Sequence, residues 1–124
     1  MATVNPTVNR DVSAAGGAIL VTWTGVNGGD TVVPFKLDKY TVSSCQISGT
    51  TITSVALLGS NDVGPALTNL APVKDWTGTP ISGIAAAAFF TPRDIPLWLQ
   101  PQVTTGVSVN FAVMLHRADL AVIG

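Results

Sequence analysis

The chain has 124 residues, the length of one domain, and its formal net charge is −1 at pH 7. Charged residues make up only 10% of it, against roughly 25% in an ordinary soluble domain. The Lys and Arg residues are scattered and form no clustered basic face, which argues against nucleic acid as a partner. A surface this neutral provides little repulsion between copies, so we expect a homo-oligomer or a larger assembly.

Two further features limit the class of protein. The single cysteine, Cys45, allows neither an intramolecular disulfide nor a cysteine-based zinc site, and it is expected to be a small buried side chain. The chain does not open with a basic stretch followed by an apolar block, and no run of 18 apolar residues occurs. We therefore expect neither a signal peptide nor a membrane partner.

The first part of the chain predicts an arm followed by strands. Residues 1–18 contain Pro, Asn and Gly without a sustained pattern, and we expect an extended N-terminal arm before a single β-sandwich domain over residues 19–124. Ala18–Thr24 is rich in β-branched and aromatic residues, which predicts a strand. Thr31–Phe35 predicts a short strand, and its Pro34 would suit a sheet edge.

The middle of the chain predicts a β-hairpin. Leu37–Ser48 and Gly49–Gly59 have the composition and alternation of strands, and a tight turn is expected at Gly49. Val73–Thr77 is a candidate for a short strand. Ile81–Thr91 contains four consecutive alanines and is predicted to be a short helix, with a buried strand of small residues as the alternative.

The last third predicts a strand over Asp94–Thr104, a turn at Thr105 and Gly106, and a strand over Val107–Arg117. Alternate residues of the second strand form one apolar face that is expected to be buried: Val107, Val109, Phe111, Val113 and Leu115. Short strands separated by frequent turns indicate an all-β fold. We expect an antiparallel β-sandwich or a jelly-roll-like barrel with at most one short helix.

The sequence contains little that would support catalysis. Its one histidine, His116, is accompanied by no nucleophile elbow, and the Asp residues are spread over turn-like segments. No Gly-rich loop carries the Lys of a P-loop. We therefore predict that the protein is not an enzyme and has no catalytic residue, no cofactor and no metal site.

The loop Gly59–Asp62, with the sequence Gly-Ser-Asn-Asp, leaves more than one interpretation open. It has one carboxylate where a calcium loop has several. A sugar site would need an exposed aromatic platform beside it. The interpretation that we favour is structural: Asn61 and Asp62 close the end of a strand through side-chain-to-backbone hydrogen bonds in an Asx-type turn.

Four stretches follow one another in the order ATVNPTVNR, ILVTWTGVNGGDTVVPF, VALLGSND and PLWLQPQVTTGVSVNFAVMLHR. This order resembles small proteins of tailed bacteriophages that decorate or cement the outer capsid. The resemblance implies a β-sandwich-type virion structural protein that is assembled in the host cytoplasm. It would bind the major capsid protein on the outside of the head as a homo-oligomer, with a homotrimer favoured over a homodimer. The same loop and late hairpin also resemble discoidin-like and carbohydrate-binding sandwiches, the alternative function, which includes a place on a virion tail or spike.

Two groups of residues are candidates for contacts. An uncharged extended arm can add to the sheet edge of a neighbour, so we expect capsid contacts from Thr3, Val4, Asn5, Pro6, Thr7, Val8 and Arg10. A charge-poor surface later in the chain is expected to lie between subunits, at Trp98, Phe89 and Phe90. On this interpretation the domain folds without its arm.

Overall fold

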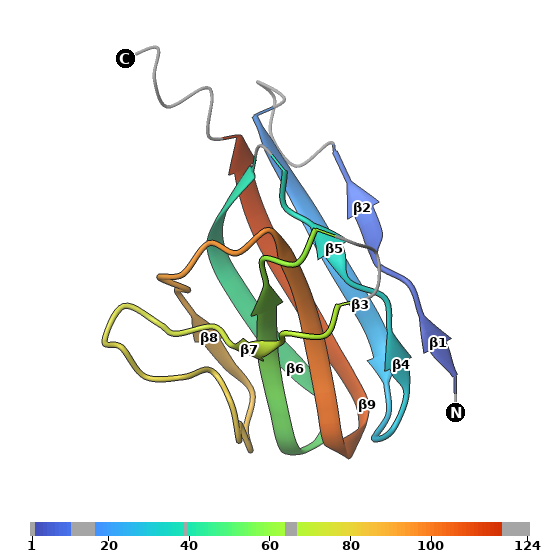
Figure 1. Cartoon of the computed structure of the whole chain (residues 1–124). Coiled ribbons are helices and arrows are strands. Elements are labelled where there is room, and N and C mark those ends of the chain that lie inside the picture. The colour runs from blue at the N-terminus through green and yellow to red at the C-terminus, as the bar shows by residue number, and fades with distance from the viewer. Residues whose placement is uncertain (1, 11–16, 39, 64–66, 118–124) are drawn as a thin grey trace.

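A computed structural model describes residues 2–10, 17–38, 40–63 and 67–117 of the chain. These residues form strands and loops and contain no helix, so the predicted all-β class is confirmed. Figure 1 shows two layers of antiparallel strands packed face to face, which is the arrangement of a β-sandwich.

The strands of the described residues are, in chain order, β1 (Thr3–Val4), β2 (Thr7–Asn9), β3 (Ala18–Val26), β4 (Thr31–Val32), β5 (Phe35–Lys36), β6 (Tyr40–Ser60), β7 (Ala71–Pro72), β8 (Ala88–Phe90) and β9 (Trp98–Arg117). The strand expected over Ala18–Thr24 is confirmed as β3. The strand expected over Thr31–Phe35 is split into β4 and β5, and Pro34, which has no N–H to donate to a ladder, lies between them.

The two longest strands, β6 with 21 residues and β9 with 20, pair with each other along their whole length. The register runs from Tyr40 opposite Arg117 to Ser60 opposite Trp98. The two separate hairpins that the sequence predicted, with turns at Gly49 and at Thr105–Gly106, are therefore wrong. The residues of the first predicted hairpin belong mostly to the single strand β6, and those of the second belong mostly to the single strand β9. These two long strands pair with each other.

The β6–β9 ribbon reverses direction by bending as a pair, as Figure 1 shows at its lower end. Gly49 has a φ of 146° and lies opposite Val109, next to Ser108, which has a φ of 50°. A Cβ on Gly49 would lie 2.5 Å from the Ser108 carbonyl oxygen, so only glycine fits this approach. Register shifts near Ile52 and Ser54 add to the bend. Gly49, which the sequence placed in a hairpin turn, is thus a residue at which the two-stranded β6–β9 ribbon bends.

The bend distributes each long strand between the two layers. One layer has the order β2, β3, second half of β9, first half of β6, β8. The other has the order β5, first half of β9, second half of β6, β7. A short parallel pair, β1 with β4, lies beside them. The outer edges of the first layer are therefore β2 and β8.

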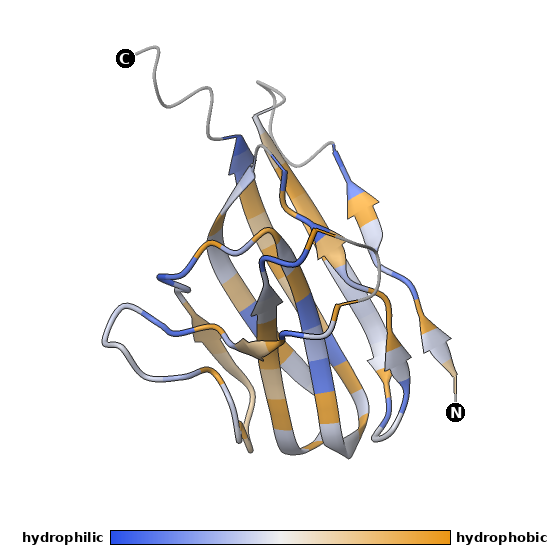
Figure 2. Cartoon of the chain, viewed as in Figure 1, coloured by the Kyte–Doolittle hydropathy of each residue, from blue (hydrophilic) through white to orange (hydrophobic). Residues whose placement is uncertain are grey.

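The core fills the space between the layers with side chains from both. Trp23 and Phe111, opposite each other on β3 and β9, are fully buried, and the Trp23 indole N–H donates to the Val33 carbonyl at 2.8 Å. Cys45 is buried, as expected, and its burial raises the pKa of its thiol to about 12. Figure 2 shows hydrophobic and hydrophilic residues alternating along β6 and β9, the period of a sheet with one buried face.

One member of the predicted buried face of the last strand does not belong to it. Val109, Phe111, Val113 and Leu115 are buried, but 51% of Val107 is exposed. The positive φ of the intervening residue, Ser108, interrupts the strand's alternation at the bend. The prediction for Val107 is therefore wrong, because the pattern assumed a regular strand through this point.

The predicted short helix at Ile81–Thr91 is also wrong. Ile81 and Ile84 instead hydrogen-bond to the backbone of β6: the Val55 and Leu57 N–H groups donate to the Ile84 and Ile81 carbonyls at 3.1 and 3.0 Å. Three residues, Ala88–Phe90, then form β8 against β6. Pairing with an existing strand outweighs the weak helix propensity of four alanines. In the expected strand Val73–Thr77, turn contacts and isolated bridges replace a regular ladder.

The N-terminal segment is extended, and it lies on its own chain. β1 pairs with β4, and β2 pairs antiparallel with β3. Val4 and Val8 are half-buried and pack against the core. Residues 2–9 are therefore paired and packed on the sandwich, whereas the sequence predicted an unpacked arm; that the domain folds without them stays a prediction. Residues 1 and 11–16 of the predicted arm lie outside the described residues.

Candidate functional site

The excursion of the chain between the two long strands, residues 61–97, carries most of the exposed large hydrophobic side chains of the described residues. Among the described residues, five large hydrophobic side chains are exposed, and four of them lie in this excursion: Val63, Trp76, Phe89 and Ile95. Apart from Val107 at the bend, the large apolar side chains of the long strands are buried or half-buried, so the excursion offers most of the exposed large apolar side chains of the described residues. We call residues 61–97 the excursion below.

The Asp62 carboxylate closes the beginning of the excursion. It accepts hydrogen bonds from the N–H groups of Thr68 and Asn69, both at 2.8 Å, and from the Asn69 side-chain amide at 2.9 Å. The Asp62 N–H donates to the Ser60 hydroxyl at 3.0 Å. The predicted side-chain-to-backbone role is confirmed for Asp62, but its partners lie six and seven residues on, beyond the reach of an Asx-type turn.

Asn61 and Trp98 tie the two ends of the excursion together. The Asn61 side-chain oxygen accepts a hydrogen bond from the Leu97 N–H at 2.8 Å. The Trp98 indole N–H donates to the Asp62 carbonyl at 3.0 Å. These contacts hold the first and last residues of the excursion side by side, so its apolar side chains are carried by an anchored loop rather than a free one.

The three donors around Asp62 lower the pKa of its carboxyl well below the ordinary value, the Asn69 backbone N–H having the largest effect. A carboxyl whose folded pKa is depressed stabilises the fold above its unfolded pKa of about 4, and this contribution is lost as the pH falls. We therefore expect Asp62→Asn to lower the thermal unfolding midpoint at pH 7, because the amide nitrogen of Asn donates and cannot replace a carboxylate oxygen that accepts from an N–H.

The difference in thermal unfolding midpoint between wild type and Asp62→Asn should be smaller at pH 3. At that pH part of the stabilisation by the Asp62 carboxylate is lost. Thermal unfolding of both proteins at the two pH values measures it. Asp30 and Asp75, whose carboxyls also have lowered pKa values, titrate in both proteins and cancel from the comparison. A difference that stayed constant between pH 7 and pH 3 would contradict the assigned role.

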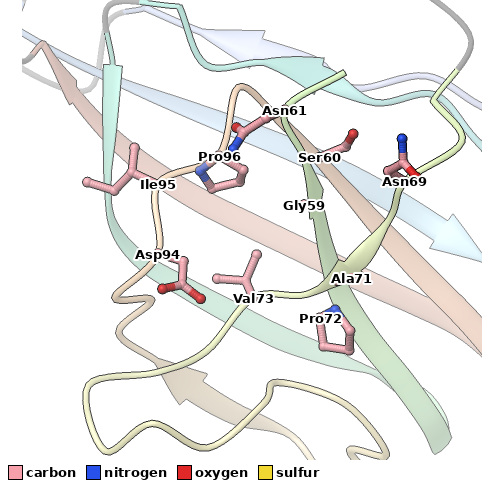
Figure 3. Close-up of a pocket in the computed structure, with 10 residues that line it drawn as sticks. All are labelled: Gly59, Ser60, Asn61, Asn69, Ala71, Pro72, Val73, Asp94, Ile95 and Pro96. Atoms are coloured by element: carbon pink, nitrogen blue, oxygen red, sulfur yellow. The ribbon is translucent and has the colours of Figure 1, made fainter. Parts of the chain in front are cut away.

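A shallow pocket of about 450 Å³ lies beside this loop, where β6 and β7 meet the end of the excursion (Figure 3). Its polar groups are largely used within the chain: the Asp94 carboxylate accepts from the Lys74 N–H at 3.0 Å and lies 3.5 Å from the Arg93 guanidinium nitrogen. Pro96 lies directly over Gly59, where an added Cβ would be 2.5 Å from the proline ring. The lining contains no aromatic ring: Gly59, Ser60, Asn61, Asn69, Ala71, Pro72, Val73, Asp94, Ile95 and Pro96.

The register of β6 and β9 brings together a pair that sequence reasoning missed. Ser43 is the extra residue of a bulge between Val42 and Ser44, and its hydroxyl is hydrogen-bonded to Nδ1 of His116. Within the described part of the chain, no carboxylate hydrogen-bonds to this imidazole. The pair therefore lacks the orienting acid of a hydrolytic triad. Only the strand register could have revealed it, because 73 residues separate the two side chains.

The three predicted subunit-interface residues do not form one surface. Phe89 is 71% exposed on β8, whereas Phe90 packs against the core. Trp98 lies in the other layer, opposite Ser60, half-buried and with the Lys36 ammonium 5.9 Å from its ring centroid. Phe89 is thus the one of the three whose side chain is mainly free to meet a partner.

The predicted capsid-contact residues divide into two sets by their burial. Thr3, Asn5 and Thr7 are exposed, whereas Val4, Pro6 and Val8 are half-buried. Arg10 is exposed, and its guanidinium donates to the Tyr40 hydroxyl at 3.4 Å. Only the first set and Arg10 present side chains to a partner while the arm stays on its own sheet.

Among the described residues, no three His, Cys, Asp or Glu side chains lie close enough to hold a metal ion. In the same part of the chain no helix has the length and apolar character needed to cross a membrane.

Comparison of the chain with known proteins found no matching family model, no similar curated protein and no similar solved structure. The functional proposal therefore rests on the chain's own geometry and chemistry and on the order of the four sequence stretches described above.

Proposed function

We propose that this chain is a virion structural protein: a non-enzymatic capsid decoration or cement protein that binds the major capsid protein on the outside of a phage head. The observation that carries the proposal is the anchored excursion, whose apolar side chains point outward from a protein of net charge −1. Large exposed apolar side chains on a nearly neutral surface are typical of a protein that is covered by partners. The sequence resemblance to decoration proteins points the same way.

The proposed mechanism is multivalent. Each copy makes a modest contact with the capsid, and a homo-oligomer engages several capsid subunits at once, so that avidity replaces single-site affinity. The exposed side of the arm (Thr3, Asn5, Thr7 and Arg10) and the excursion offer two separate surfaces for this. One of these surfaces would bind the capsid, and the other would form the contact between copies of the chain.

The experiment that tests the function uses particles produced from the genome that encodes this chain. Antibodies against the purified chain are used for immunogold labelling of purified particles in the electron microscope. Label on the outside of heads would support the proposal. Particles without the chain, or label confined to tails, would overturn it, and tail label would move the tail or spike alternative to first place.

A pair of arm variants tests which surface meets the capsid. Replacing Thr3, Asn5 and Thr7 together with Asp is expected to reduce the occupancy of heads at least tenfold with little change in the unfolding midpoint, because these side chains are exposed. Val8→Ala is expected to do the opposite: it should destabilise the half-buried arm by about 1 kcal/mol and leave occupancy unchanged at a temperature where the protein is folded. Occupancy is measured from stained gels of purified particles.

A matched charge control separates a local effect from a change of net charge. Thr51, Thr53 and Thr104 are also exposed and lie on the long strands rather than on the arm. Replacing these three with Asp adds the same charge and should leave head occupancy unchanged. Equal losses in both triple variants would show that the arm is not the contact.

The discoidin-like or carbohydrate-binding alternative gains no specific support from the pocket. Sugar sites in proteins commonly use an aromatic platform with polar groups around it, and the pocket lining has no ring. Trp76 is exposed but does not line the pocket. Binding of a glycan panel by the purified chain would favour this alternative.

A further inference from the structure

The link between β3 and β4 carries the one Asn-Gly pair of the sequence, Asn27–Gly28. Asparagine deamidates most readily before glycine, because glycine has no side chain to hinder attack by its own backbone nitrogen. Packing favours glycine at position 28, where a Cβ would lie 3.1 Å from the Thr104 carbonyl oxygen. The close approach of the link to β9, at the lower end of the molecule in Figure 1, thus depends on a chemically labile pair.

Both reacting groups of this pair are hydrogen-bonded to β9. The Gly28 N–H donates to the Gly106 carbonyl at 3.0 Å, and the Asn27 side-chain oxygen accepts from the Ser108 N–H at 2.9 Å. The turn is also closed on itself, because the Asn27 N–H donates to the Asp30 carboxylate at 2.9 Å and the Asp30 N–H donates to the Asn27 carbonyl at 3.1 Å. Deamidation requires the Gly28 nitrogen to lose its proton and to approach Cγ of Asn27, so the bonds to β9 must break first.

We propose that Asn27 is a protected modification site: it is stable while the link is bonded to β9, and it deamidates when this end of the molecule opens. Access of water is not what limits the reaction, because Asn27 and Gly28 are both exposed in the folded chain. The limiting step is the local opening that separates the Gly28 N–H from the Gly106 carbonyl. Such openings have free energies of their own, up to that of global unfolding. The inference does not depend on binding to the capsid.

The reaction needs only water and a base from the solvent. The deprotonated Gly28 nitrogen attacks Cγ of Asn27, and the bond between Cγ and Nδ2 breaks. The side-chain nitrogen takes up the proton that the base removed and leaves as ammonia. Water then opens the resulting succinimide: cleavage of its Cγ–N bond gives aspartate, and cleavage between the main-chain carbonyl carbon of residue 27 and the nitrogen gives isoaspartate.

The two products differ in their effect on the fold. Aspartate keeps an oxygen at the position where the Asn27 side chain accepts from the Ser108 N–H. Isoaspartate adds one atom to the main chain between residues 27 and 28, which displaces the Gly28 N–H from the Gly106 carbonyl. We therefore expect that a chain with isoaspartate at position 27 does not close this end of the molecule again.

The test compares deamidation rates in the folded and the unfolded chain. The protein is incubated at pH 8 with and without guanidinium chloride, and samples are digested with trypsin and analysed by mass spectrometry. The tryptic peptide of residues 11–36 contains Asn27 and no other Asn or Gln, so its mass reports this site alone. We expect the folded chain to react about tenfold or more slowly than the unfolded one, in step with hydrogen exchange at the Gly28 N–H. Equal rates would overturn the proposal.

A pair of glycine variants separates local opening from global unfolding. Gly49→Ala crowds the carbonyl oxygen of Ser108, the residue that holds the Asn27 side chain. Gly83→Ala is the matched control, because Gly83 also has a positive φ but lies on the excursion, and a Cβ there would have no heavy atom within 4 Å. At a temperature where both variants are folded, Gly49→Ala should deamidate about threefold or more faster than wild type and Gly83→Ala at the wild-type rate. Equal acceleration in both would refute a local opening at the bend.

Refolding provides a second readout. The chain is aged in guanidinium chloride and refolded, and the native fraction is separated from the rest by size exclusion. An endoprotease that cleaves at aspartate but not at isoaspartate then distinguishes the two products in the peptide of residues 11–36. Isoaspartate is expected to be depleted from the native fraction and aspartate to be retained in it. The same proportion of isoaspartate in both fractions would show that the contact between Gly28 and Gly106 is not needed to close the fold.

Discussion

Replacement of Trp23 with Ala is expected to lower the free energy of unfolding by about 3–5 kcal/mol, the usual cost of removing a large aromatic side chain from a packed core. Trp23 is fully buried on β3 and stands opposite Phe111 on β9. It also donates its indole N–H to the Val33 carbonyl, which belongs to the link between β4 and β5. Equilibrium unfolding in guanidinium chloride measures the loss.

Two further Trp variants check that explanation. Trp23→Phe keeps an aromatic ring in the core but leaves the Val33 carbonyl without its donor, so an intermediate cost of about 1–3 kcal/mol is expected. Trp76→Ala removes an exposed ring and should change stability by less than about 0.5 kcal/mol. A loss below 1 kcal/mol for Trp23→Ala would mean that the two layers do not pack around this residue.

The second large effect is expected at the bend of the long ribbon. Gly49→Ala should destabilise the protein by roughly 2–4 kcal/mol, because the φ of 146° is unfavourable for a residue with a side chain and the added Cβ would approach the Ser108 carbonyl oxygen to 2.5 Å. The neighbour in this contact is backbone, which cannot move away without unpairing β6 from β9. Chemical denaturation of the variant measures the cost.

Gly83→Ala separates the two causes. Gly83 also has a positive φ, 62°, but a Cβ there would have no heavy atom within 4 Å. Only the backbone conformation is then disfavoured, at about 1 kcal/mol. If both variants lost the same stability, the close approach at the bend would not be what requires glycine at position 49.

The carboxylates show how a chain with so few charges uses them. Asp30 accepts hydrogen bonds from the N–H groups of Ala2 and Asn27, and Asp62 and Asp75 each accept from backbone N–H groups of their own loops. The expectation that the Asp residues serve turns is confirmed for these three. Asp11 and Asp119 lie outside the described residues.

The contacts of Asp30 also link the arm to the fold. Because the Asp30 carboxylate holds Ala2, and because β1 and β2 pair with β4 and β3, the arm is fixed at three places on its own chain. Deleting residues 2–10 would therefore remove an edge strand as well as a contact surface. Substitution of the exposed arm side chains is the cleaner test of capsid binding, because it leaves these contacts in place.

The sequence by itself determined the class of the fold and much of its interior. β-branched and aromatic residues with a period of two predict strands wherever they occur, and this was sufficient for β3, for the buried Cys45 and for the apolar face from Val109 to Leu115. These features depend on local composition and on alternation between two faces. Both are properties of a short stretch of chain, and both survive in any sheet that the stretch joins.

Only the tertiary structure decided which strands are partners. The alternation is the same on both sides of Gly49 and of Gly106, so a local hairpin and a long bent ribbon produce one pattern, and only the pairing of β6 with β9 distinguishes them. That pairing also brings Ser43 to His116. In the same way, hydrogen bonds from β6 to Ile81 and Ile84 override the helix propensity of the alanines, and Ala88–Phe90 pairs with β6 as β8. The free energies of these pairings and hydrogen bonds come from contacts between residues that are distant in sequence, so a local sequence pattern does not predict them.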